Sequence, residues 1–374
     1  MSFPILRVAI VGCGIIGIHH ARVIARHPDL TLVALVDSVT KTVIALADLV
    51  ENELSAPRPA DFASLREAFV ATSIDLVVIC TPSGLHVAHA EEALAAGADV
   101  VIEKPLDVSL PRARRLAELA EEAEKCGQVV SVISQHRFDP ASVAVAAAAH
   151  GGGFGRLTSA VASVAWWRSQ EYYDSGQWRG TWELDGGGAV MNQGVHTVDL
   201  LVWILGRPVE IFAQTALLAH ERMEVEDVAV ATIRFESGAL AVLHATTAAA
   251  PGLSVRLQVH GSTGSAVIDD DQLEYFHSES GPEGNQASSV LDADQLRDGQ
   301  RRDDEFVTAH LRQYIDVVEA IQTGRAPGVR VQDALLSLAV VRAIYISATL
   351  GTPIAFDAVL GGEFDQFAVA TGGN

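Results

Sequence analysis

The sequence predicts an α/β protein whose first part forms a doubly wound parallel sheet and whose second part forms an α+β domain with a large, mostly antiparallel sheet. Over residues 1–135, short apolar, β-branched runs alternate with helical stretches, which is typical of a parallel sheet covered by helices. Over residues 136–374, glycine turns separate β-rich runs, which is typical of antiparallel strands. At 374 residues the chain is long enough for these two domains.

The strands expected in the first domain cover residues 5–11, 31–36, 75–80, 99–102 and 129–133. Ligands of such sheets bind beyond the carboxyl ends of the strands. The sequence places its most unusual residues at those ends. We therefore expect one crevice lined by residues 12–17, Asp37, residues 81–82 and residues 103–105.

A glycine-rich turn follows the first strand and opens a helix. Gly12, Gly14 and Gly17 form the pattern G-x-G-x-x-G. The first glycine permits a tight turn, the second lets the backbone approach a pyrophosphate, and the third lets the helix pack closely on the strand. The first amides of this helix, at Ile15 and Ile16, face the anion. This order of strand, glycines and helix predicts a Rossmann-type dinucleotide site.

The second strand ends in Asp37, 20 residues beyond Gly17. A carboxylate in this place accepts hydrogen bonds from both ribose hydroxyls and repels a 2′-phosphate, which favours NAD over NADP. The neighbouring Ser38 leaves room for NADP as the alternative, because a small polar residue tolerates a phosphate. We expect NAD to be the cofactor.

The fourth strand is followed directly by Glu103, Lys104 and Pro105. Lys104 therefore stands at the carboxyl edge of the sheet, where Pro105 disfavours a helical conformation for it. Both Glu103 and Lys104 are expected to border the cofactor. An ammonium that is tuned by burial and neighbouring charge can polarise an oxygen beside a transferred hydride, so we expect Lys104 to be catalytic rather than a solvated surface lysine.

In the second half, the expected strands include residues 157–167, 228–235, 240–246 and 255–260, and the expected helices cover residues 192–205, 307–323 and 332–350. Asn192 and His196 stand four apart at the start of the first of these helices, so both should project from one face. The flanking glycines let backbone and ligand come close. A histidine titrates in the range needed to take a proton as hydride leaves the same carbon, although a satisfied interior histidine is the alternative.

Aromatic residues and arginines are concentrated between residues 166 and 182. Aromatic faces suit the apolar side of a pyranose ring, and guanidinium groups suit a carboxylate or phosphate. For any one tryptophan, packing of an aromatic strand on helices is an equal alternative. We expect a substrate wall that includes Trp167, Arg168, Tyr172 and Arg179.

Together these motifs resemble the Gfo/Idh/MocA family of sugar-type oxidoreductases. The resemblance covers nearly the whole chain and rests on residues 11–17, 81–86, 103–105, 137–140, 186–199, 260–264 and 331–334. It implies that Lys104 is catalytic, that the loop from Thr81 and Pro82 to His86 contacts the cofactor, and that His196 takes part in proton transfer.

The sequence departs from the family pattern at Asn192, where many members carry Asp. An amide can orient His196 or bind a sugar hydroxyl, but it cannot relay a proton. The Asn-Gln form of the motif resembles a subgroup that includes dehydrogenases of nucleotide-linked sugar acids.

Charge and composition exclude several other classes. The chain holds 26 basic and 47 acidic residues, a formal net charge of −21, which argues against nucleic acid or an anionic membrane surface as its main partner. Cys13, Cys80 and Cys126 are widely spaced, which predicts buried structural thiols in a reducing compartment. The N-terminus has no leader pattern, and apolar runs such as 141–149 are shorter than a bilayer span, so we expect a cytoplasmic protein.

A metal site is not expected. The two candidate histidine pairs lack a carboxylate or cysteine at useful spacing; they are His19 with His20, and His86 with His89. The polar segment 278–305 is expected to be a solvated loop, with a lid or an oligomer arm as alternatives.

We therefore expect an NAD-dependent dehydrogenase that oxidises a secondary alcohol of a sugar, polyol or nucleotide-linked sugar, or reduces the corresponding ketone. Two alternatives stay open. One is a glycosidase that uses NAD for transient oxidation, and the other is a non-catalytic NAD-sensing protein. An open antiparallel sheet suits face-to-face association, so by analogy we expect a homodimer or homotetramer.

Overall fold

The computed structural model describes residues 3–176, 179–297 and 304–371. The chain forms two compact units. The first contains residues 1–135 and 303–335, and the second contains residues 136–302 and 336–374. Residues 303–335 belong to the first unit although most of the second unit, residues 136–302, precedes them in the sequence.

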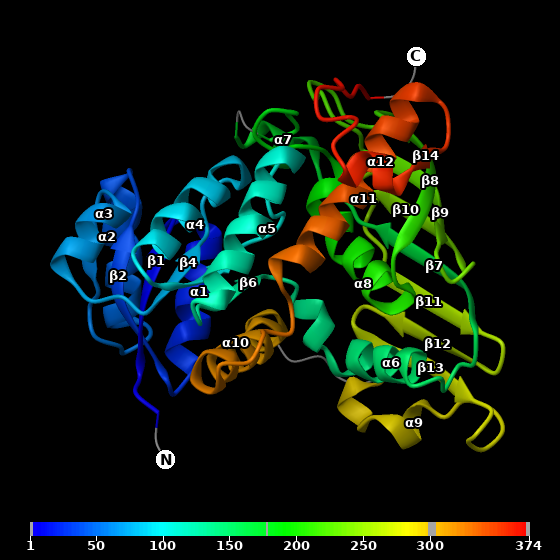
Figure 1. The fold of residues 1–374 in the computed structure, drawn as a ribbon, viewed down its shortest axis with the longest axis horizontal. Coiled ribbons are helices and arrows are strands. Elements are labelled where there is room, and N and C mark those ends of the chain that lie inside the picture. Colours follow the sequence, from blue (N-terminus) through cyan, green and yellow to red (C-terminus); the bar gives the residue numbers. More distant parts are fainter. Residues whose placement is uncertain (1–2, 177–178, 298–303, 372–374) are drawn as a thin grey trace. The chain divides into compact units, whose positions relative to one another are not determined.

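The first unit is built on a six-stranded sheet with the strand order β3-β2-β1-β4-β5-β6, and all its neighbouring strands are parallel (Figure 1). This confirms the predicted doubly wound sheet. The sequence missed β3, because this short strand is not buried and shows no apolar run. The strands are β1 (Leu6–Val11), β2 (Leu30–Val36), β3 (Ala60–Phe62), β4 (Leu76–Ile79), β5 (Asp99–Ile102) and β6 (Val130–Val132).

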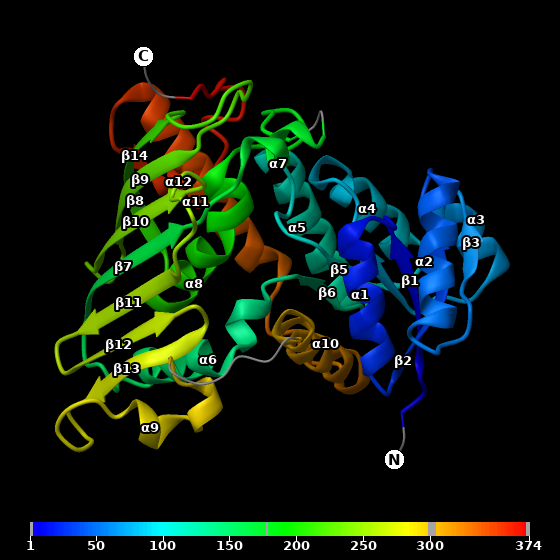
Figure 2. The same ribbon diagram turned by 180° about the vertical axis from the view of Figure 1, so that it is seen from behind.

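The helices of the first unit are α1 (Ile15–Arg26), α2 (Thr40–Asn52), α3 (Leu65–Ala71), α4 (His86–Ala95), α5 (Leu110–Lys125) and α10 (Glu305–Thr323). Helix α10 packs against α1 although the two are almost 300 residues apart in the chain (Figure 2). Its side chains Tyr314, Val317 and Val318 belong to the same apolar cluster as Val23 and Ile24 of α1.

The second unit is built on an eight-stranded sheet with the strand order β13-β12-β11-β7-β10-β9-β8-β14. Only the pair β7 and β10 is parallel, which confirms the predicted mostly antiparallel sheet. The strands are β7 (Leu157–Ala165), β8 (Pro208–Ala216), β9 (Val228–Phe235), β10 (Leu240–Thr246), β11 (Val255–Gly261), β12 (Gly264–Asp269), β13 (Gln272–Ser278) and β14 (Ile354–Ala355).

Helices cover one face of this second sheet. Helix α8 (Val195–Leu205) packs on β7, and α6 (Pro140–His150) packs on β12 and β13. Side chains of β10 that point toward the helices, such as Leu243, are buried, whereas Leu240 and Val242 on the other face are 57% and 41% exposed. The shorter helices are α7 (Gln170–Asp174), α9 (Ala287–Val290) and α12 (Phe356–Leu360).

Helix α11 (Val331–Leu350) is, by length and composition, the one helix in the described ranges that could cross a membrane. The sequence analysis overlooked it, since it considered only shorter runs such as 141–149. All residues from 338 to 346 except Arg342 are at most 1% exposed, so this stretch of α11 is packed inside the protein.

Two smaller expectations were wrong. Cys126 is exposed at the end of α5 rather than buried, because the amphipathic pattern of α5 ends just before it. The segment 278–305 is not an irregular solvated loop throughout. In its described part it contains α9 and a 3₁₀ turn (Ala293–Gln295), and Gln286 and Ala287 are buried because they pack beside β13.

Candidate functional site

The glycine-rich turn between β1 and α1 has the conformation that its sequence predicted. Gly12 has φ +97°, and a Cβ atom there would lie 2.6 Å from the backbone carbon of Cys80. A Cβ atom on Gly17 would lie 2.2 Å from the Gly12 oxygen. Gly14 faces open space instead, because a Cβ atom on it would meet no neighbouring atom within 4 Å. Gly12 and Gly17 are therefore required by the fold, whereas Gly14 leaves room for a ligand beside the exposed Ile15 and half-buried Ile16.

Asp37 lies half-buried at the end of β2 and links the first two strand ends. Its Oδ2 accepts the Cys13 N–H at 2.8 Å, and its Oδ1 accepts the Val39 N–H at 2.9 Å. Burial, and then the charge of Asp37, raise the pKa of the Cys13 thiol to about 12, so this thiol stays protonated. Ser38 is exposed beside Asp37.

The loop after β4 contains Thr81, Pro82 and His86. The buried imidazole of His86 lies 2.9 Å from the Thr81 carbonyl oxygen and 3.0 Å from that of Pro105, and so links this loop to the segment after β5. Burial lowers the pKa of His86. The Thr81 hydroxyl oxygen is buried without a hydrogen-bond partner in the described structure. Such an orphaned group fits a bound ligand.

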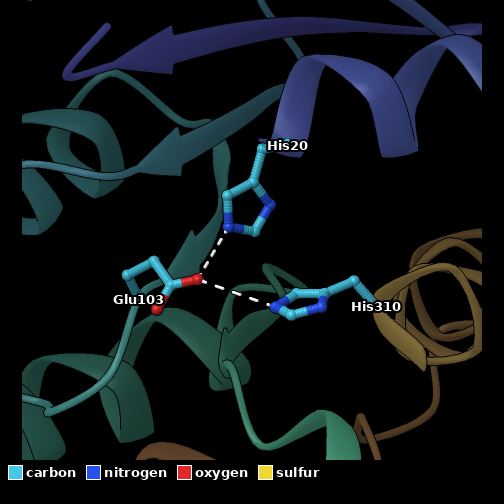
Figure 3. Close-up of side chains that lie close together, drawn as sticks. All are labelled: His20, Glu103 and His310. Carbon is cyan, nitrogen blue, oxygen red and sulfur yellow. Dashed lines mark hydrogen bonds and ion pairs between the residues drawn. The ribbon is translucent and has the colours of Figure 1, made fainter. Parts of the chain in front are cut away.

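The segment after β5 carries Glu103 and Lys104. Glu103 is 6% exposed, and Figure 3 shows one of its oxygens directed toward His20 and His310. Oε1 accepts the His20 Nε2–H at 2.8 Å, and Oε2 accepts the backbone N–H of Lys104 at 2.9 Å. Burial alone raises the pKa of Glu103, but His20, His310 and Lys104 outweigh it and hold the pKa below its usual range. Lys104 is half-buried, and its peptide bond to Pro105 is cis.

The spacing argument against a metal site was incomplete. Within the described residues, the fold assembles two groups whose composition suits a metal ion: His20, Glu103 and His310, and separately His136, Asp139 and Asp271. Glu103 is 83 residues from His20 in the sequence, so chain spacing could not show the first group.

In the second unit, His196 is the second residue of α8, which continues from a π-helical turn, η3 (Ala189–Gly194). Asn192 lies in this turn, and its amide donates to Asp185 Oδ1 at 2.8 Å and to the Gly187 oxygen at 3.1 Å. Single π turns inside helices occur frequently at functional sites. The amide of Asn192 is therefore oriented by a carboxylate.

The glycines before this turn meet protein groups rather than open space. A Cβ atom on Gly188 would lie 1.7 Å from the backbone oxygen of Glu226, and one on Gly187 would lie 2.2 Å from the Tyr345 hydroxyl. The buried Glu226 carboxylate accepts the N–H groups of Gly188 and Val190 and the Tyr345 hydroxyl. Burial raises the pKa of Glu226 to about 7. The expectation that Gly187 and Gly188 admit a ligand is therefore corrected.

His136 is a neighbour of His196 that the sequence analysis missed. The two rings lie edge to face with centroids 4.9 Å apart. His136 Nδ1 lies 2.9 Å from Asp139 and 3.0 Å from Asp271. Burial lowers the pKa of His136, but Asp271 and Asp139 outweigh it and raise it to about 10. The only signal in the sequence is that His136 directly precedes the motif 137–140.

That motif also supports α8 directly. Arg137 makes two hydrogen bonds of 2.7 Å to Asp199, and Ser337 donates to the same carboxylate at 2.9 Å. All three residues are buried. Asp199 lies three residues after His196, so this ion pair fixes the helix that carries the histidine.

The predicted substrate wall is assembled in part. Tyr172 lies between two guanidinium groups, whose Cζ atoms are 5.2 Å (Arg168) and 4.2 Å (Arg179) from its ring centroid. Arg168 also lies 5.0 Å from the ring of Trp166, and its buried Nε has no hydrogen-bond partner in the described structure. Trp167 is 38% exposed, and its ring lies near His220, so the tryptophan ring beneath Arg168 is that of Trp166.

Profiles of known protein families match a part of each unit. The family profile described as "Oxidoreductase family, NAD-binding Rossmann fold" matches residues 6–131, and the "GFO/IDH/MocA C-terminal domain" profile matches residues 142–267. An uncharacterised oxidoreductase of Escherichia coli, YdgJ, is 30% identical over 70% of this chain and 70% of its own length. The scyllo-inositol 2-dehydrogenase (NAD(+)) of Bacillus subtilis is 25% identical over 94% of this chain and 96% of its own.

Among solved structures, the WlbA dehydrogenase of Bordetella pertussis, in complex with NADH and UDP-GlcNAcA, matches with a TM-score of 0.81 and 31% identity. The match covers 95% of this chain and 99% of the Bordetella chain. The open glycine turn, the orphaned Thr81 hydroxyl and the match to the NAD-binding profile agree on a dinucleotide-binding unit. The chain belongs to the Gfo/Idh/MocA family of oxidoreductases and contains its NAD-binding Rossmann domain.

Proposed function

We propose that the protein is an NAD-dependent dehydrogenase that transfers a hydride between the nicotinamide ring and a secondary alcohol or ketone carbon of a sugar, polyol or nucleotide-linked sugar. One observation carries this proposal. The glycine turn, the Thr81 loop and Lys104 follow β1, β4 and β5, which are adjacent strands of one parallel sheet. Their carboxyl ends meet at the edge where such sheets bind ligands.

Bound NAD supplies the acceptor for the hydride. The amides at the start of α1 would hold its pyrophosphate, and Asp37 would accept the ribose hydroxyls. Asp37 also supports NAD over NADP, because a 2′-phosphate would meet a carboxylate that is already fixed by Cys13 and Val39.

Lys104 and His196 are the residues proposed to handle the hydroxyl proton. The ammonium of Lys104 would donate a hydrogen bond to the reacting oxygen, and the imidazole of His196 would take the proton during oxidation. Asn192, held by Asp185, would bind a substrate hydroxyl rather than relay a proton.

The arginine pair supports an anionic substrate. Arg168 and Arg179 stack on the same ring, and the unpartnered Nε of Arg168 offers a further donor. Two guanidinium groups suit a carboxylate or phosphate. We propose a sugar acid or nucleotide-linked sugar as the substrate class, and a neutral inositol as the second candidate because of the Bacillus relative.

The test compares wild type with Lys104→Ala on a panel of UDP-sugar acids, inositols and free sugars, with NADH formation followed by absorbance. We expect turnover to fall about 10²- to 10⁴-fold, because general acid–base catalysis contributes that much, while NADH affinity stays within a factor of two. Wild-type turnover in Lys104→Ala would refute the assignment. Substrate cleavage without net NADH formation would instead indicate a glycosidase, and NADH binding without any turnover would indicate a sensing protein.

A further inference from the structure

A chain of buried hydrogen bonds leads from α10 to the backbone of Lys104, and Figure 3 shows its middle link between His20 and Glu103. The Tyr314 hydroxyl lies 2.7 Å from His20 Nδ1, and His20 Nε2 lies 2.8 Å from Glu103 Oε1. The other carboxylate oxygen, Glu103 Oε2, lies 2.9 Å from the backbone nitrogen of Lys104. Tyr314 and His20 are fully buried, and Glu103 is nearly so. These four residues come from α1, α10 and the segment after β5, so the chain of bonds exists only in the folded unit.

The proton positions follow from the two ends of this chain. The Lys104 N–H is a donor, so Glu103 Oε2 accepts it. Glu103 Oε1 then accepts the His20 Nε2–H, and His20 Nδ1 shares the remaining hydrogen bond with the Tyr314 hydroxyl. Each donor of the chain thus has one acceptor, and the carboxylate keeps its negative charge beside Lys104.

His310 lies beside this chain without joining it. Its Nδ1–H donates to the Phe306 oxygen at 2.9 Å, and burial lowers the pKa of His310 to about 3, so it is neutral. Its Nε2 lies 3.9 Å from Glu103 Oε1, which is too far for a hydrogen bond.

A metal ion is the competing explanation for His20, Glu103 and His310. Ligand atoms about 2.1 Å from a tetrahedral zinc ion lie about 3.4 Å from one another. The 2.8 Å separation of His20 Nε2 and Glu103 Oε1 is instead the length of a charge-assisted hydrogen bond. The geometry therefore favours a shared proton over a shared metal ion.

We propose that Glu103, held by His20 and Tyr314, is a positioning residue that fixes the Lys104 peptide and stabilises the Lys104 ammonium by its charge. This inference rests on the proposed function of Lys104. Two observations support it. Glu103 binds the lysine's own backbone N–H, and the charge of Lys104 is one of the causes that lower the pKa of Glu103, an interaction that acts equally on both partners.

Within the described residues, the groups that shift the pKa of Glu103 are His20, His310 and Lys104, and none of them is a carboxylate. The titratable groups that interact with it, besides Lys104, are His19 and His20 on α1, Cys80 after β4, His86 on α4, and His310 and Tyr314 on α10. Replacing Glu103 by Gln should therefore remove the negative charge at this point, and no second carboxylate should take its place.

The experiment uses the lysines themselves as probes, because the chain has only Lys41, Lys104 and Lys125. The full-length protein is acetylated briefly with acetic anhydride across a pH series, and each lysine is read by peptide mass spectrometry. In Glu103→Gln we expect the pH midpoint of Lys104 acetylation to fall by about one pH unit, since an opposing charge is lost. The midpoints of Lys41 and Lys125 should not move.

Activity gives the second readout. With whichever panel substrate the wild type oxidises, kcat of Glu103→Gln should fall about 10- to 100-fold, because a small displacement of a catalytic group has effects of this size. Tyr314→Phe removes the hydroxyl that holds His20, so kcat should fall because Glu103 is less well positioned. The charge of Glu103 is kept in this variant, so the pH midpoint of Lys104 acetylation should not move. Ser131→Ala, which removes another buried hydroxyl of the same unit that bonds to Val329, is the matched control and should change neither quantity.

An unchanged Lys104 midpoint and unchanged kcat in Glu103→Gln would overturn this inference. If Glu103→Gln does not fold, wild-type kcat in Tyr314→Phe would overturn it. One equivalent of a transition metal in the purified protein would also overturn it, in favour of a metal centre. Wild-type turnover in Lys104→Ala would contradict the proposed function itself, which separates the two failures.

Discussion

The carboxylate of Asp37 accepts the N–H of Cys13 through one oxygen and the N–H of Val39 through the other. Both bonds are local to the ends of β1 and β2, so Asp37 is held in place before any ligand arrives. A fixed negative charge at the end of β2 repels the 2′-phosphate of NADP, whereas it can accept a hydrogen bond from the 2′-hydroxyl of NAD. Cofactor choice can therefore depend on this one side chain.

We predict that Asp37→Asn weakens the preference for NADH over NADPH by about tenfold or more, because a repulsion worth about 1.4 kcal/mol changes affinity tenfold. The amide oxygen can still accept the Cys13 N–H, so the turn keeps its shape. The measurement is the ratio of the two dissociation constants by nucleotide fluorescence. Asp48→Asn, which makes the same change at an exposed carboxylate of α2, is the control and should leave this ratio unchanged. An unchanged ratio in Asp37→Asn would refute the role of Asp37.

The placement of residues of this kind was predictable because it depends on the strand that precedes each of them. The glycine turn, Asp37 and Lys104 each follow a strand, and that position alone indicates chemistry. His136 and His310 were not predictable. His136 lies beside Asp271, and His310 lies beside Glu103, and both acids come from distant segments of the chain. The sequence around an isolated histidine does not indicate which residue will contact it.

Among the elements, the π turn before α8 depends on a buried acid. Glu226 accepts two backbone N–H groups at the start of the turn, and Gly188 lets the backbone of Glu226 come into contact. The helix itself was predicted from its apolar residues and glycines. The π turn was not predicted, because a single wider turn is too short to produce a recognisable spacing of apolar residues.

We expect Gly188→Ala to lower the free energy of unfolding by about 1–3 kcal/mol, because its methyl group would overlap a backbone oxygen. Urea unfolding followed by tryptophan fluorescence measures this loss. Gly84→Ala is the control, since a Cβ atom there has its nearest neighbour at 3.8 Å, and its stability should change little. Equal stability of Gly188→Ala and wild type would show that η3 can shift to accept the methyl group.

At the scale of the whole molecule, the second unit leaves one face of its sheet apolar and exposed. Val242 on β10 pairs with Val161 on β7 and with Thr232 on β9, which in turn pairs with Phe212 on β8. Val161, Phe212 and Val242 are 36–41% exposed, and Val230 and Leu240 are on the same face. A row of this kind is typical of a protein interface.

We propose that copies of the chain associate through this face, and we predict that Val242→Lys reduces the assembly. A lysine at the centre of the row would bury a charge in each interface, so the molar mass measured by light scattering should fall toward that of the 39.6 kDa chain. Val70→Lys, at an 86% exposed position on α3, is the matched control and should leave the mass unchanged. A wild type that is already monomeric would refute the interface.

Helix α10 has a consequence for how the protein is made. During synthesis, β1 to β6 leave the ribosome long before residues 305–323 exist, and strands β7 to β13 of the second sheet are produced in between. Throughout that interval His20 lacks the hydroxyl of Tyr314, and the apolar side of α1 lacks Val317 and Val318. A nascent or prematurely terminated chain therefore exposes the apolar side of α1 to chaperones and proteases. Only a nearly complete translation product can cover this surface with α10.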